Sequence, residues 1–236
     1  MSIGEIVVHV EQTQAAKTRL AFAASVARAV GGRLVAISQM ESRDWQSWEG
    51  GEQIVEWRQL GALRQAGLHA RYADLTIVGQ PPANGPDHVT ELIMTTGRPF
   101  LVVPQYGQFQ HPCRKILVAW NGSREATRAV FDAMPLMASA EQVIVLTLDA
   151  PSGDHGESPG ADISLAIARH GARVEVVRST AGAIDTGNAL LSRVAEHGVD
   201  LLVMGAFSRH PLREKTLGGA THHVLRHMTV PVLLSH

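Results

Sequence analysis

The sequence predicts an α/β protein with parallel sheets, arranged as two tandem domains of similar design. Short apolar runs alternate with segments of helical periodicity along the whole chain of 236 residues. Strands that are regularly separated by helices form βαβ units, in which the strands are parallel and the crossovers are right-handed. The same order of signals occurs twice, so we expect two copies of one parallel-sheet domain.

The second half carries the fuller set of signals. The run at 142–148 is continuously apolar, as expected for a strand buried on both faces. The run at 115–120 ends in Asn121, Gly122 and Ser123, and Ser123 is expected to cap the helix that follows. The other expected elements of this half are strands at 173–177, 201–204 and 230–234, and helices at 126–137, 161–170, 184–197 and 220–227.

The first half repeats this order in an abbreviated form. Residues 73–79 match 199–205 position by position, and each segment ends in glycine. The segment at 42–53 is too short for the helix expected between the second and third strands. We therefore predict an abbreviated domain at 1–106 and a more complete one at 113–236, joined by a polar linker that contains proline and glycine. The other elements expected in the first half are strands at 5–10, 33–37, 54–57 and 97–103, and helices at 15–30 and 60–70.

The bulk properties argue against several classes of function. A net charge of -1 and an isoelectric point near 6.9 do not favour nucleic acid or anionic membrane as a partner. No apolar run approaches the roughly 18–20 residues that span a bilayer. The first residues lack the features of a signal peptide, so we expect a cytoplasmic protein. The single cysteine, Cys113, is expected to be a linker thiol without a catalytic role.

Three stretches of the second half together resemble the universal stress protein family. They are the run Ile-Leu-Val-Ala-Trp-Asn-Gly-Ser at 116–123 and the segments at 200–205 and 230–236. The resemblance covers 113–236 in the order of its elements and is weaker over 1–104. It implies an open, five-stranded, Rossmann-like sheet of the adenine-nucleotide α-hydrolase type, with helices on both faces. Many members form dimers, so it also implies either a homodimer or an internal pseudo-dimer of the two domains.

A subset of the family binds ATP, and its glycine motif has a counterpart here. That motif is a glycine, two residues, a second glycine, nine residues, and a third glycine followed by serine or threonine. The resemblance implies a phosphate cradle of backbone amides beside one polar side chain near the ribose or base. The phosphate contacts would come from Gly205, Ser208, Gly218, Gly219 and Ala220, and the polar side chain would be that of Asn121.

Two substitutions weaken this cradle. Ser208 replaces a glycine that lets the backbone approach phosphate closely, and Gly219 replaces the hydroxyl residue. One lost hydrogen bond to a charged group costs about 1.5–3 kcal/mol, which is roughly a tenfold to hundredfold loss in affinity. Two interpretations stay open: a retained nucleotide or phosphate site, or glycine turns that let helices pack on the sheet. In the first domain Pro81 and Pro82 remove N–H donors at the equivalent place, so phosphate binding is not expected there.

No catalytic set is evident, and we expect a non-enzymatic stress-response protein with ATP as its candidate ligand. One alternative is a slow ATP-hydrolysing enzyme, for which Asp149 and Asp200 are the carboxylates near predicted strand ends. The other alternative is a protein-binding scaffold that uses the basic loop at 209–215. His223 and His227 are only half of a zinc site, so no metal is expected. Tryptophans at 45 and 48 are expected to pack over a sheet edge or a domain interface.

Overall fold

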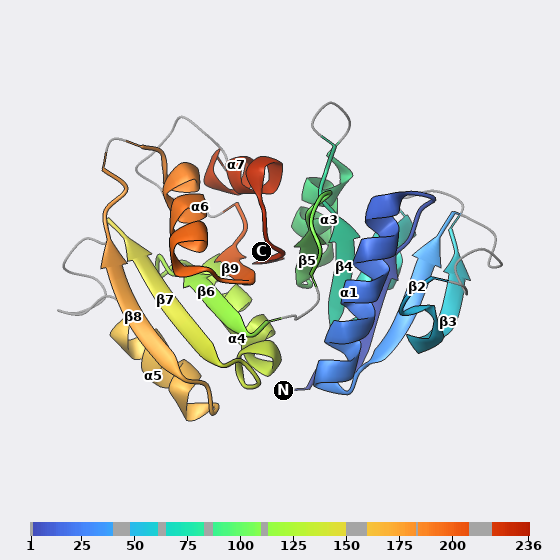
Figure 1. Cartoon of the computed structure of the whole chain (residues 1–236), viewed down its shortest axis with the longest axis horizontal. Helices are drawn as coiled ribbons and strands as arrows, with labels where there is room; N and C mark the ends of the chain where they lie inside the picture. Colours follow the sequence, from blue (N-terminus) through green and yellow to red (C-terminus); the bar gives the residue numbers. More distant parts are fainter. Residues whose placement is uncertain are drawn as a thin grey trace. The chain divides into compact units, whose positions relative to one another are not determined.

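The computed structural model describes residues 2–39, 48–60, 65–82, 87–109, 113–149, 160–182, 184–207 and 219–236. The chain divides into two compact units, Met1–Pro112 and Cys113–His236 (Figure 1). Each unit is an open sheet whose neighbouring strands are parallel, so the predicted α/β class is confirmed. Among the helices that the structure describes, none has both the length and the apolar character needed to cross a membrane.

The second unit has the strand order β10-β9-β6-β7-β8. The inner strands are buried because helices cover both faces: Figure 1 shows α4 and α5 on one face and α6 and α7 on the other. The chain runs outward from β6 and then returns to β9 on the other side of β6. The elements are β6 (Lys115–Ala119), α4 (Arg124–Met137), β7 (Gln142–Leu148), α5 (Ala161–Arg169), β8 (Val174–Ser179), α6 (Thr186–His197), β9 (Leu201–Gly205), α7 (Gly219–His227) and β10 (Val232–Ser235).

The first unit repeats this topology, with the strand order β3-β2-β1-β4-β5. Between β2 and β3 the described residues form only a short 3-10 helix, η1. The elements are β1 (Glu5–His9), α1 (Gln14–Val30), β2 (Arg33–Ser38), η1 (Gly51–Gln53), β3 (Ile54–Gln59), α2 (Ala66–Ala70), β4 (Leu75–Gly79), α3 (His88–Thr96) and β5 (Phe100–Val103).

The expected helix at 60–70 is wrong at its start. The backbone N–H of Leu60 donates to the carbonyl of Ser38 at 2.6 Å, which continues the pairing of β3 with β2. Leu60 is therefore held in an extended segment, and the described helix begins only at Ala66. A pattern of apolar residues at helical spacing does not reveal that the first of them is paired with a neighbouring strand.

In each unit an aspartate joins the amino ends of two adjacent strands. The carboxylate of Asp74, just before β4, accepts hydrogen bonds from the amides of Gly4 and Glu5 at 2.8 and 3.0 Å. Asp200, just before β9, accepts from the amides of Arg114 and Lys115 at 3.0 and 3.1 Å. Both aspartates thus join the amino ends of two adjacent strands, which explains why the motif Asp-Leu recurs at the start of β4 and β9.

Candidate functional site

The second unit has a cavity at the carboxyl ends of β6 and β9. In open α/β sheets, ligands bind at this edge where the strand order reverses, and here the reversal falls between β6 and β9. The cavity has a volume of about 120 Å³. Its lining residues are Ala119, Trp120, Asn121, Leu146, Leu148, Thr186, Leu190, Met204, Gly205, Ala220 and Thr221.

Three residues of the predicted cradle line this one cavity: Asn121, Gly205 and Ala220. Gly219 lies next to them as the first residue of α7. Ser208 and Gly218 lie outside the described residues, as does the basic loop at 209–215. The tertiary structure therefore brings together residues from the turn after β6, from β9 and from α7, which are far apart in the sequence.

Asn121 shapes the turn at the cavity rim. Its side-chain oxygen accepts a hydrogen bond from the amide of Ser123 at 3.1 Å, which is an Asx-type turn. The hydroxyl of Ser123 then accepts from the amide of Ala126 at 3.1 Å, so the predicted cap of α4 is confirmed. The turn that carries Asn121 is thus anchored to the start of α4.

Gly205 is required by packing, whatever ligand is present. A Cβ atom at this position would lie 2.5 Å from the amide nitrogen of Ala126 and 2.6 Å from the carbonyl carbon of Glu125. Both atoms belong to the first turn of α4, which cannot move without displacing the helix. The first glycine of the motif therefore lets α4 approach the end of β9.

A hydrogen bond between Phe207 and Thr221 joins the turn after β9 to α7. Phe207 has a φ of 54°, in the left-handed region that phenylalanine rarely adopts. Its amide donates to the hydroxyl of Thr221 at 3.1 Å, and its ring meets that of His222 edge-on at 5.2 Å. Sequence reasoning did not single out Phe207, because nothing in its residue type signals such a backbone conformation.

The cavity walls are mainly apolar. Leu146, Leu148, Leu190 and Met204 line it together with Trp120, whose backbone amide donates to the carbonyl of Leu146 at 2.9 Å. Such walls suit a flat, apolar ring. Ligand pockets usually measure about 300–1,000 Å³, so this cavity encloses only a fragment the size of a base. The amino end of α7 adjoins it and offers backbone N–H groups to an anion.

The two carboxylates considered for ATP hydrolysis, those of Asp149 and Asp200, lie outside the cavity. Asp149 accepts hydrogen bonds from the amide of Ala181 at 3.1 and 3.3 Å and so links the segments after β7 and β8. Asp200 lies at the opposite, amino end of β9. Neither residue lines the cavity.

The paired histidines of α7 do not form a metal centre with other described residues. The rings of His223 and His227 lie 4.4 Å apart, and Nε2 of His223 is 3.1 Å from the side-chain oxygen of Asn188 on α6. In the described part of the chain, no group of three or more histidine, cysteine, aspartate or glutamate residues is placed to hold a metal ion. This pair joins α7 to α6.

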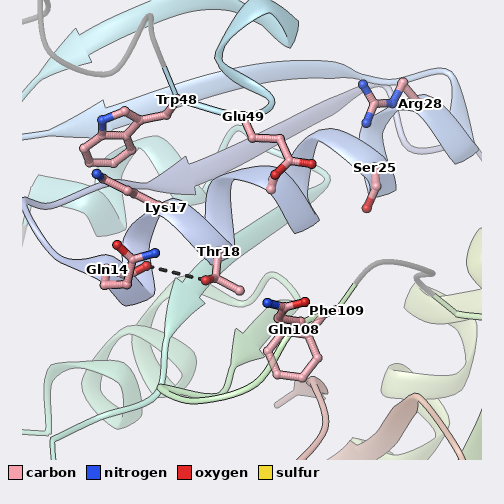
Figure 2. Close-up of a pocket in the computed structure, with 10 residues that line it drawn as sticks. Gln14, Lys17, Thr18, Ser25, Arg28, Trp48, Glu49, Gln108 and Phe109 are labelled. Atoms are coloured by element: carbon pink, nitrogen blue, oxygen red, sulfur yellow. Dashed lines mark hydrogen bonds between the residues drawn. The ribbon is translucent and has the colours of Figure 1, made fainter.

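A larger, open cleft of about 750 Å³ runs beside α1 in the first unit (Figure 2). The ammonium group of Lys17 lies 5.2 Å from the ring centre of Trp48, and Phe109 meets Phe22 edge-on at 6.0 Å. Trp48 thus contacts α1 through Lys17, and its expected packing over a sheet edge or a domain interface stays a prediction; Trp45 lies outside the described residues. The cleft is lined largely by the polar side of α1 and does not lie at the strand ends.

Comparison with known proteins supplies the family. The model of the universal stress protein family matches residues 112–236, which is more than half of the chain. This chain belongs to the universal stress protein family. Among curated proteins, none matches the sequence at a significant level.

Two solved structures resemble this chain over nearly its whole length. A universal stress protein from Archaeoglobus fulgidus DSM 4304 has 12% sequence identity and a TM-score of 0.74, with 99% of this chain and 96% of that chain covered. The functionally unknown protein PA1789 from Pseudomonas aeruginosa PAO1 has 16% identity and a TM-score of 0.62, with 99% and 92% covered. These likenesses confirm the fold of the chain, an open parallel α/β sheet in each unit.

One further relative was solved with a ligand. A universal stress protein in complex with cAMP has 22% identity and a TM-score of 0.38, and the match covers 52% of this chain and 97% of that chain.

Proposed function

We propose that this universal stress protein is a non-enzymatic stress-response factor that binds an adenine nucleotide weakly in its second unit. The proposal rests on one observation: Asn121, Gly205 and Ala220 line the same cavity, at the place where the strand order of the sheet reverses. The apolar walls would receive the base, and Asn121 would lie near the base or ribose. The amino end of α7 would face the phosphates.

The absence of catalysis is part of the proposal. Phosphoryl transfer needs carboxylates or other groups that hold Mg²⁺ and position the attacking water. Asp149 is engaged by the amide of Ala181, and Asp200 lies at the far end of its strand. These positions support binding without turnover, with the signal passed on through a conformational change or a partner.

The affinity for ATP is expected to be low. Ser208 and Gly219 stand where the ATP-binding members have a glycine and a hydroxyl residue. The loss of one hydrogen bond to phosphate predicts about a tenfold to hundredfold weaker affinity than in a member with the full motif.

Calorimetric titration of the full chain with ATP and Mg²⁺ tests this proposal. We expect saturable binding in the wild type and none in Ala220→Glu, which places a carboxylate in the cavity at the start of α7. Ala161→Glu is the matched control, because it changes the first residue of α5, which does not line the cavity. Lack of binding by the wild type at millimolar ATP, or equal binding by Ala220→Glu, would overturn the proposal.

The proposed quaternary arrangement is a homodimer or an internal pseudo-dimer, in the cytoplasm. Light scattering on the purified chain distinguishes the two arrangements. A particle of twice 25.4 kDa would support the homodimer, and a particle of 25.4 kDa would overturn it and leave the pseudo-dimer as the proposed arrangement.

A further inference from the structure

The cleft beside α1 lies where the first unit lacks a helix. In the second unit, α5 runs between β7 and β8 and packs against α4. Between β2 and β3 of the first unit, the described residues form only the short helix η1. One side of α1 is therefore left open, and the cleft of about 750 Å³ follows it (Figure 2).

The residues of α1 also make room for the cleft. The caps Thr13 and Ser123 align α1 with α4. Counting from these caps, Ala21 corresponds to Phe131. Phe131 meets the ring of His170, directly after α5, edge-on at 6.5 Å. The aromatic side chain and the helix that occupy this place in the second unit thus have no counterpart among the described residues of the first.

One wall of the cleft is a turn that packs directly on α1. Gly50 is buried with a φ of 83°, and a Cβ atom there would lie 2.7 Å from the Cβ of Ala24. The glycine thus lets the backbone before η1 approach the helix closely. In the same turn, the amide of Gly51 donates to the carbonyl of Trp48 at 2.9 Å. This turn holds Trp48 and Glu49, which line the cleft.

The opposite wall is the segment after β5. Phe109 is half-buried, and its ring meets that of the buried Phe22 edge-on at 6.0 Å. Gln108 precedes it and is exposed. Since β3 and β5 are the two outer strands of this unit, the turn before β3 and the segment after β5 approach α1 from opposite sides. Figure 2 shows the side chain of Thr18 between Trp48 and Phe109.

The charged groups of the cleft balance. Within the described ranges, neither the ammonium group of Lys17 nor the carboxylate of Glu49 has an oppositely charged partner. The ammonium group lies 5.2 Å from the ring centre of Trp48 instead. Arg28, the other charged residue of the lining, is paired with Glu52 at 3.6 Å. One positive and one negative charge remain, so the cleft has no net charge that would select a phosphate or a polyamine.

The rest of the lining consists mainly of uncharged hydrogen-bonding groups. The side-chain amides of Gln14 and Gln108 each offer donors and an acceptor. The hydroxyl of Thr18 donates to the carbonyl of Gln14 at 3.5 Å. The hydroxyl of Ser25 donates to the carbonyl of Phe22 at 2.7 Å, so both hydroxyls keep lone pairs that accept. Together these groups suit the hydroxyls of a ligand, which both donate and accept.

A sugar chain fits this combination better than a peptide. A peptide usually adds a strand to an open sheet edge or places an apolar helix face in an apolar groove. Here the cleft follows the helix α1, whose backbone groups bond within the helix, and the lining is largely polar. A sugar ring presents apolar C–H faces, which pack on aromatic rings, and an edge of hydroxyls, which bond to amides and carboxylates.

We propose that the first unit binds a short, uncharged oligosaccharide along α1. The sugar rings lie between Trp48 and Phe109, and their hydroxyls bond to the side chains of Gln14, Gln108 and Glu49. The cleft volume of about 750 Å³ falls within the usual range for ligand sites, about 300–1,000 Å³. The proposal goes beyond the nucleotide site, since it concerns the other unit and a ligand without phosphate.

Ligand-observed NMR on the full chain tests this proposal, with maltotriose, cellotriose and chitotriose as probes. We expect saturable binding of at least one of these trisaccharides. Because the ligand is uncharged, its affinity should not change when the salt concentration rises from about 0.05 M to about 0.5 M. Inorganic phosphate, spermine and ATP should not displace it, because the cleft selects no charge and ATP is proposed to bind the second unit.

Two substitutions with matched controls test the site itself. Ala21→Phe fills the cleft with the residue type that α4 has at this place, and should abolish binding. Its control is Ala29→Phe, the same change at an exposed position of α1 outside the cleft lining. Trp48→Ala removes one aromatic ring and should weaken binding about tenfold. Its control is Tyr72→Ala, which removes an exposed ring of the same unit outside the lining.

The two substitutions act independently, so Trp48→Ala still decides the outcome if Ala21→Phe fails to fold. The proposal is overturned if none of the three trisaccharides binds, or if either folded variant binds as tightly as the wild type. It is also overturned if phosphate, spermine or ATP displaces the sugar, or if the affinity falls as the salt concentration rises.

Discussion

Gly205 and Ala126 lie so close that a Cβ atom on the glycine would be 2.5 Å from the amide nitrogen of the alanine. This contact joins the end of β9 to the first turn of α4, beside the cavity of the second unit. The first glycine of the family motif can have two roles, to let a helix pack closely and to contact phosphate. In this chain Gly205 has the packing role without any ligand, and its contact with phosphate is a matter for binding experiments.

Gly205→Ala is expected to destabilise the second unit whether or not a nucleotide is present. The added methyl group meets backbone atoms, and overpacking of this kind costs about 1–3 kcal/mol. Urea unfolding of the full chain measures the change. Gly67→Ala is the control, because its nearest contact is the side chain of Leu92 at 3.2 Å and alanine favours the helix. An unchanged unfolding free energy for Gly205→Ala would contradict the packing role.

The two helix caps provide a matched pair of substitutions. Thr13→Ala and Ser123→Ala each remove a hydroxyl that accepts from the amide three residues later, at 3.0 and 3.1 Å. Each should cost about 1 kcal/mol. Hydrogen exchange should show lower protection in α1 for the first variant and in α4 for the second. Ser139→Ala, which removes the hydroxyl of an exposed residue after α4, is the control and should change the exchange little. Lower protection in the unit that does not carry the substituted cap would contradict a local effect of capping.

Thr221→Val tests the fastening of the β9 turn to α7. The substitution removes the acceptor of the Phe207 amide, and an unsatisfied buried N–H costs about 1–3 kcal/mol. Thermal unfolding should therefore show a lower melting temperature. Thr186→Val is a control from the same cavity, where the threonine is exposed. Equal melting temperatures for the two variants would show that the hydrogen bond between Phe207 and Thr221 does not stabilise the fold.

Glu11 should make the first unit sensitive to acid. Its folded-state pKa of about 2 lies below the ordinary value of 4.5, so its ionised form stabilises the fold. That contribution is complete above pH 4.5 and is lost as the pH falls toward about 2. Carbon NMR of the carboxyl group measures the titration directly. Glu11→Gln should remove this part of the pH dependence of stability, and a titration midpoint near 4.5 would contradict the Arg19 and His9 contacts.

Cys113 should be unreactive in the folded protein. Its side chain is buried, and burial together with the charge of Asp200 raises the pKa of the thiol, so little thiolate is present near neutral pH. A disulfide reagent should label it slowly in the native state and rapidly after denaturation in urea. Rapid labelling of the native chain would show that the segment around Cys113 opens.

Much of the fold could be predicted from local patterns. The apolar run at 142–148 coincides with β7, and the turn residues before α4 identified its cap, Ser123. These features depend on neighbours within one turn or one strand, and residue type reports them directly. The helix expected to begin at Leu60 was wrong because the amide of Leu60 pairs with Ser38, which is distant in the sequence and lies in a different strand.

The candidate site was only partly predictable. The glycine spacing pointed to Gly205 and Ala220, but it could not distinguish a packing contact from a phosphate contact. Nothing in the sequence signalled the left-handed Phe207 or the partner that its amide finds in Thr221. Ser208 and Gly218 stay predictions, since they lie outside the described residues.

The sequence by itself determined the family, the repeated parallel-sheet design and the helix cap at Ser123, because periodicity, turn residues and motif spacing act over short stretches of chain. Only the tertiary structure decided that Gly205 packs on α4 and that Glu11, Arg19 and His9 form one network in a pocket of the first unit. The physical reason is that a contact depends on how close a helix approaches a strand end. Residue type shows that a side chain is buried or charged, but not which partner it meets.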